Sequence, residues 1–170
     1  MRLYSGKIPS IAQDLIRKLK EDGDIEVSDV SEAQLDVEAV LKEYLRLERE
    51  LTEKAKDYME KRRLPYEQLP KIKRAMAEER DIGIGDESVS YIANQILEAF
   101  MHSRFVEEVF ADDADMRKKI QGILRKHMQV DADIDHEVRR RIKNLQEGTA
   151  TWEIEYQKVM EQLRRQHKLE

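Results

Sequence analysis

The sequence predicts an all-α protein in which two tandem three-helix modules pack together, with a short β-ribbon between them. The first observation is composition. Of the 170 residues, 39% are charged and 40% are apolar, which suits long amphipathic helices and argues against global disorder. Six glycines and three prolines are too few for the closely spaced turns of a β-sandwich or barrel.

The second observation is an internal repeat, with a spacing of roughly 81–84 residues. The clearest block aligns VEAVLKEYLR at 37–46 with IQGILRKHMQ at 120–129, where Tyr44 is replaced by His127. We therefore divide the chain into modules at 1–85 and 86–170. Because the joint between them is short, we expect the modules to pack on each other. The alternative is chance similarity between amphipathic helices, because the alignment needs small gaps.

The third observation is apolar spacing of three and four residues, which defines three helices in each module. Pro9 stands in the first turn of the first helix, and Pro65 stops the second. Ser31 and Gln34 suit a capping box at the start of the second helix. The predicted helices cover about 8–21, 32–62, 68–80, 87–102, 112–146 and 151–167.

Two short segments between helices are predicted to be extended. Ile25 and Val27 alternate with charged residues in the first module. Val106, Val109 and Phe110 form the corresponding segment of the second module. We expect the two segments to pair as the ribbon.

No sequence motif for catalysis, metal binding or phosphate binding emerges. Cysteine is absent, so thiolate metal sites, disulfides and a cysteine nucleophile are excluded. The acidic run from Asp131 has His136 at the sixth position of a calcium loop and Ile142 at the twelfth, where Gly and Glu are required. Gly83 and Gly85 form a lone GxG without a third glycine. We expect a protein that is not an enzyme and that uses no cofactor or metal.

The charge pattern and the chain start bear on partners and compartment. The net charge of −5 is spread over both halves, so neither half is a basic domain or an acidic tail. The sequence has no apolar run long enough to span a membrane, and its start lacks the apolar core of a signal peptide. The absence of cysteine fits a reducing compartment, so we expect a cytoplasmic protein without a membrane partner.

Three stretches resemble an uncharacterised bacterial family, domain-of-unknown-function family 507. They are the opening MRLYSGKIPSIAQ, the joint EERDIGIGDESV and the segment ILEAFMHSRFVEEVFADD. The resemblance covers essentially the whole chain, as two copies of the module. It implies a bacterial cytoplasmic origin. No activity is assigned to the family, so the resemblance identifies no functional residue.

An acidic residue interrupts the apolar seam of each long helix at the same place. Glu48 follows Tyr44 by four residues, and Asp131 follows His127 by four. One interpretation is a polar notch that fixes register or receives a partner. In that case Asp131 would favour the protonated form of His127. The alternative is that the neighbouring apolar residue, Leu47 in the first long helix or Val130 in the second, fills the core and leaves the acid at the surface.

Basic clusters lie toward the ends of the long helices, and they could neutralise nucleic-acid phosphates. The alternative is that they complement the negative ends of helix dipoles. Aromatic residues make up only 6% of the chain, which leaves few candidates for stacking on bases. The cluster residues are Lys61, Arg62, Arg63, Arg139, Arg140, Arg141 and Lys143.

Two functions remain open on the sequence alone. The first is a non-enzymatic helical adaptor that binds another protein, and it is favoured by the duplicated helices and the interrupted seams. The second is a nucleic-acid-associated protein that uses the basic ends of the long and third helices. The two differ in salt dependence, because nucleic-acid binding releases counterions. The identity of a protein partner and the oligomeric state are not specified by the sequence.

Overall fold

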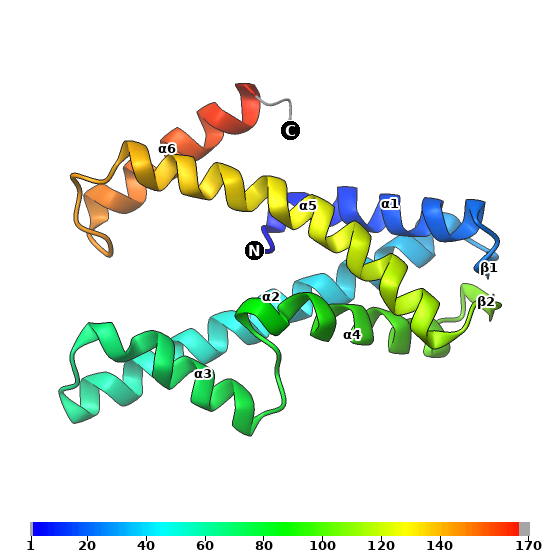
Figure 1. The fold of residues 1–170 in the computed structure, drawn as a ribbon, viewed down its shortest axis with the longest axis horizontal. Helices are drawn as coiled ribbons and strands as arrows, with labels where there is room; N and C mark the ends of the chain where they lie inside the picture. Colours follow the sequence, from blue (N-terminus) through cyan, green and yellow to red (C-terminus); the bar gives the residue numbers. More distant parts are fainter. Residues whose placement is uncertain (1, 167–170) are drawn as a thin grey trace.

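The computed structural model describes residues 2–166, apart from the side chains of residues 130–132. It is an all-α fold with a two-stranded ribbon, as predicted (Figure 1). The elements in chain order are α1 (Ile8–Glu21), β1 (Ile25–Val27), α2 (Val30–Arg62), α3 (Leu69–Glu79), α4 (Ser88–His102), β2 (Val106–Val109), α5 (Asp113–Arg141) and α6 (Ala150–Gln166). Short 3-10 turns, Ser5–Lys7, Tyr66–Gln68 and Gly85–Glu87, precede α1, α3 and α4.

Two predicted details of the helix ends are wrong. The side chain of Asp29, not Ser31, caps α2, and it accepts a hydrogen bond from the Glu32 backbone N–H at 3.1 Å. The reason is that α2 begins at Val30, which places Ser31 inside the first turn. Helix α5, the long helix of the second half, ends at Arg141 rather than near 146. Its next residue, Ile142, leaves helical geometry with φ −109° and ψ 19°.

The ribbon forms where it was predicted. β1 and β2 pair antiparallel, with Ile25 opposite Val109 and Val27 opposite Val106. Phe110 lies just beyond the ribbon instead of within it. Its backbone N–H donates to the carbonyl oxygen of Asp24 at 2.8 Å, while its side chain is exposed.

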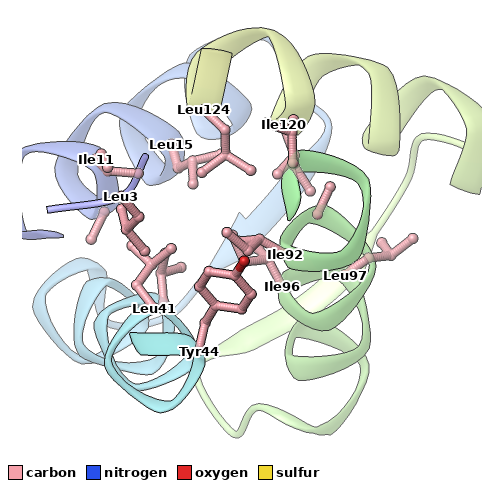
Figure 2. Close-up of a cluster of buried hydrophobic side chains, with 14 of the residues drawn as sticks. Leu3, Ile11, Leu15, Leu41, Tyr44, Ile92, Ile96, Leu97, Ile120 and Leu124 are labelled. Atoms are coloured by element: carbon pink, nitrogen blue, oxygen red, sulfur yellow. The ribbon is translucent and has the colours of Figure 1, made fainter. Parts of the chain in front are cut away.

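The main hydrophobic core is built by α1, α2, α4 and α5 together (Figure 2). Each of these helices contributes fully buried branched side chains. Burying one such side chain is worth about 1.5–3 kcal/mol. The core therefore contains helices from both halves of the chain. Representative members are Ile11 and Leu15 of α1, Leu41 of α2, Ile92 and Ile96 of α4, and Ile120 and Leu124 of α5.

Two helical hairpins, α2–α3 and α5–α6, extend from this core toward the same side of the molecule, and their tips are separate (Figure 1). The α5–α6 hairpin has a smaller core of its own, in which Trp152 stacks on Tyr156 with 5.0 Å between ring centres. Tyr4, in the N-terminal segment, packs against this second core. In the α2–α3 hairpin, Leu51 and Ala77 are buried and join the main core.

The two halves of the chain make reciprocal contacts. Helix α1 contacts α2 and α5, while α4 contacts α5 and α2. The order of helix, strand, long helix and helix occurs in each half. The division at residues 85 and 86 stays a prediction, and it falls inside the turn Gly85–Glu87. Within residues 2–166, no helix is long and apolar enough to cross a membrane.

Candidate functional site

A cleft of about 520 Å³ lies where α2 and α3 meet the N-terminal segment and the joint before α4. Some of its lining residues are buried and apolar: Leu3, Ala77, Ile82 and Met128. Its charged lining residues are exposed or half-buried and carry both signs: Arg2, Glu48, Lys73, Arg74, Glu78, Asp86 and Glu87. We call the cleft lined by these two sets of residues the joint cleft.

Tyr44, one of the predicted seam residues, connects α2 to the joint. Its side chain is 5% exposed, and its hydroxyl donates a hydrogen bond to the carbonyl oxygen of Gly83 at 3.1 Å. Its ring lies 5.9 Å from that of Tyr91 on α4. Burial, with a further contribution from Glu48, raises the pKa of the Tyr44 hydroxyl, which therefore stays protonated and able to donate.

Gly83 fits this place because the backbone approaches α4 closely. A Cβ atom on Gly83 would lie 2.6 Å from the Tyr91 Cβ atom and 2.7 Å from the Glu87 carbonyl oxygen. Gly85 adopts a left-handed φ of +60°, which glycine tolerates without strain. The Ser88 hydroxyl closes the turn by donating to the Gly85 carbonyl oxygen at 2.7 Å. Both glycines of the GxG motif thus have a structural role in shaping the joint cleft.

Glu48, the second seam residue, forms an ion pair across the α2–α3 hairpin. Its carboxylate lies 3.2 Å from the Lys73 ammonium group, and the two side chains are 29% and 20% exposed. Leu47 beside it is also half-buried and packs against the main core. Glu48 therefore faces α3 and the joint cleft, while Leu47 contributes to the core.

His127 lies away from the joint cleft and bridges α5 to α1. Its Nε2 atom is 3.0 Å from a carboxylate oxygen of Asp14, which also binds Arg17. Burial of Asp14 opposes its ionisation, but the hydrogen bonds from His127 and Arg17 outweigh that effect and lower the pKa of Asp14. The side chains of Val130 and Asp131 lie outside the described part of the chain. The partner that the structure gives His127 is Asp14, which sequence spacing did not suggest.

The two predicted basic clusters lie at the tips of the two separate hairpins (Figure 1). At the α5–α6 tip, acids neutralise most of the charge. Arg139 pairs with Asp135 at 3.1 Å and with Glu147 at 2.9 Å. Arg140 and Arg141 both pair with Glu137. Lys143 is exposed.

The cluster at the α2–α3 tip is different. Lys61, Arg62 and Arg63 are exposed and have no ion-pair partner among residues 2–166. The Arg62 guanidinium lies 3.8 Å from the centre of the Tyr58 ring. In the described part of the chain, this cluster therefore has three basic side chains without an ion pair, whereas the other cluster has Lys143 alone.

Sequence reasoning missed the part played by the N-terminal segment. Arg2 and Leu3 line the joint cleft, and the Tyr4 hydroxyl lies 3.4 Å from that of Tyr156 on α6. The Tyr156 hydroxyl in turn donates to Asp135 on α5. The contact between Tyr4 and Tyr156 joins residues 152 positions apart, so no local pattern reveals it. The one available signal was the opening stretch that carries the family resemblance.

The arrangement defines a helical protein with a mixed-charge cleft. Among the residues with described side chains, no three His, Asp or Glu residues gather in a way that could hold a metal ion. Over residues 1–169 the chain matches the family described as protein of unknown function (DUF507), and it belongs to that family. Comparison with curated proteins gave no match.

Proposed function

We propose that the chain is a non-enzymatic helical interaction protein that binds another protein through the joint cleft. The observation that carries the proposal is the lining of that cleft, which combines buried apolar residues with charges of both signs. Protein interfaces commonly have this composition, with an apolar centre and a polar margin. A cleft of about 520 Å³ is within the range that encloses a small ligand or a few anchoring side chains.

The charges around the joint cleft favour a partner segment with an apolar anchor flanked by both an acid and a base. Arg2 and Arg74 supply positive charge from the N-terminal segment and α3, while Asp86 and Glu87 supply negative charge from the turn before α4. Such complementarity contributes mainly to specificity and association rate. The hydrogen bond between Tyr44 and Gly83 supports a preformed site, which lowers the entropic cost of binding.

A pull-down from native lysate, with nuclease treatment, tests the proposal. The bait is the full chain, compared with the variants Arg74→Glu and Arg104→Glu. Both arginines are exposed, but only Arg74 lines the joint cleft, so Arg104→Glu is the matched control. We expect a nuclease-resistant protein partner that the first variant loses and the second keeps. A partner retained equally by both variants, or none after nuclease, would contradict the proposal.

Nucleic-acid binding is the second candidate function. A specific observation favours it: the cluster at the α2–α3 tip has no acidic partner among the described residues, unlike the α5–α6 cluster. Nucleic-acid binding by this cluster would weaken steeply with added salt, whereas protein binding centred on apolar contacts would weaken little.

We also propose that the chain arose by duplication of one module and acts in a bacterial cytoplasm. The recurring element order and the reciprocal contacts of α1 with α5 and α4 with α2 support duplication. The absence of cysteine supports a reducing compartment.

A further inference from the structure

We propose that the tip of the α2–α3 hairpin, residues 58–66, is a binding surface for single-stranded nucleic acid. The tip combines the two features that such surfaces share, exposed positive charge and exposed aromatic rings. Tyr58 is 37% exposed and Tyr66 is 63% exposed. The basic cluster Lys61–Arg63 lies between them in the chain. This inference refines the second candidate function and does not depend on the joint cleft.

The charge at the tip is available to phosphates. Lys61 and Arg63 are exposed without an ion pair in the described part of the chain, and Lys71 on the neighbouring first turn of α3 is exposed in the same way. Glu60 and Glu67 lie nearby in the sequence, but neither forms an ion pair there. Exposed basic side chains of this kind gain affinity by releasing the counterions that surround a nucleic acid.

The aromatic rings at the tip supply stacking surfaces. The Arg62 guanidinium covers one face of the Tyr58 ring, 3.8 Å from the ring centre. A nucleic-acid base can stack on a guanidinium or on an aromatic ring. Tyr66 follows Pro65 at the start of a 3-10 turn, and it is more exposed than Tyr58. Bases inside a duplex are already stacked on each other, so these rings favour single strands.

Backbone hydrogen bonds close the tip where α2 ends. Arg63 ends α2 in the left-handed conformation, with φ 53° and ψ 44°. The Leu64 backbone N–H donates to the Met59 carbonyl oxygen at 3.0 Å, and that of Arg63 donates to Glu60 at 3.2 Å. Both bonds satisfy carbonyl groups at the helix end. A preorganised tip loses less entropy when it binds.

The test is fluorescence anisotropy on the full chain with labelled oligouridine RNA, duplex DNA of the same length and a polyglutamate peptide, each titrated over a range of salt. We expect binding to oligouridine that is tighter than to the other two probes and that falls with salt. Tyr66→Ala is expected to weaken it by about fivefold or more, whereas Tyr66→Phe retains the ring and the affinity. Both substitutions change an exposed side chain, so folding is preserved.

A charge variant and its control complete the design. Lys61→Glu with Arg63→Glu is expected to lower the slope of log affinity against log salt by about 1.4 for a single strand. The control, Arg140→Glu with Arg141→Glu, reverses two charges at the other tip and is expected to keep oligouridine affinity within about twofold, because those arginines are paired with Glu137. If the control weakens binding as much as the tip variant, nucleic-acid binding stands but its assignment to this tip fails. Absence of oligouridine binding, or equal binding of polyglutamate, overturns both the nucleic-acid function and its assignment to this tip.

Discussion

The hydroxyl of Tyr44 donates to the carbonyl oxygen of Gly83 at 3.1 Å, and this bond ties the longest helix to the joint between the two halves of the chain. Both residues are buried, and buried polar groups are stable only when they are hydrogen-bonded. The bond fixes one wall of the joint cleft relative to α2.

Tyr44→Phe should therefore lower the free energy of unfolding by about 1–3 kcal/mol, because it leaves the buried Gly83 carbonyl group without its donor. Chemical denaturation followed by circular dichroism measures the change. Tyr58→Phe is the matched control, since no hydrogen bond involves that exposed hydroxyl within residues 2–166. Equal stabilities of the two variants would show that the bond contributes nothing.

Gly83→Ala should destabilise the protein by about 1–3 kcal/mol, because the added Cβ atom would lie 2.6 Å from the Tyr91 Cβ atom and 2.7 Å from a backbone oxygen. Gly122→Ala in α5 is the control. Its Cβ atom would meet nothing within 4 Å, and alanine is the better helix former by roughly 0.5–1 kcal/mol. Opposite signs are thus expected from thermal or urea unfolding of the two variants. A stabilising Gly83→Ala would refute the close approach.

Glu48→Leu is expected to change stability by less than about 1 kcal/mol, because the ion pair with Lys73 is partly solvated and a leucine gains little burial there. A double-mutant cycle with Glu48→Gln and Lys73→Gln should give a coupling energy of about 0.2–1 kcal/mol. A strong stabilisation by leucine would instead mean that the acid is retained at a cost in stability. That outcome would favour the polar-notch interpretation of the seam.

The bond between Asp14 and His127 predicts a specific loss of stability in acid. The pKa of Asp14 is lowered in the folded protein from its ordinary value of 3.8. The ionised carboxylate therefore contributes stability above that value, and the contribution is lost as pH falls through the folded pKa. Urea unfolding at pH 7, 5 and 3 should show a larger drop below about pH 4 for the wild type than for Asp14→Asn. Parallel pH profiles would disprove the linkage.

The local elements of the fold could be predicted because their determinants are local. Apolar spacing and Pro65 located α2 to within two residues at its start, and alternation at Ile25 and Val27 located β1. The cap was misplaced because Asp29 and Ser31 are both good capping residues, and only the backbone distinguishes them. The apolar spacing does not mark the early end of α5 at Arg141.

The candidate sites were less predictable, because they depend on contacts between distant residues. Tyr44 and Glu48 were identified from the seam, but their partners, Gly83 and Lys73, lie on other elements. The partner of His127 is 113 positions away in the sequence. The difference between the two basic clusters also required the structure, since it rests on which arginines have acids within reach.

The most direct test of protein binding through the joint cleft is site-specific photo-crosslinking in cells. A benzophenone side chain is placed at Glu78, which lines the joint cleft, and separately at Arg104, an exposed residue outside it. We predict a discrete protein adduct from position 78 that survives nuclease treatment and that is missing from position 104. Equal adducts from both positions, or no protein adduct from position 78, would contradict the proposed function.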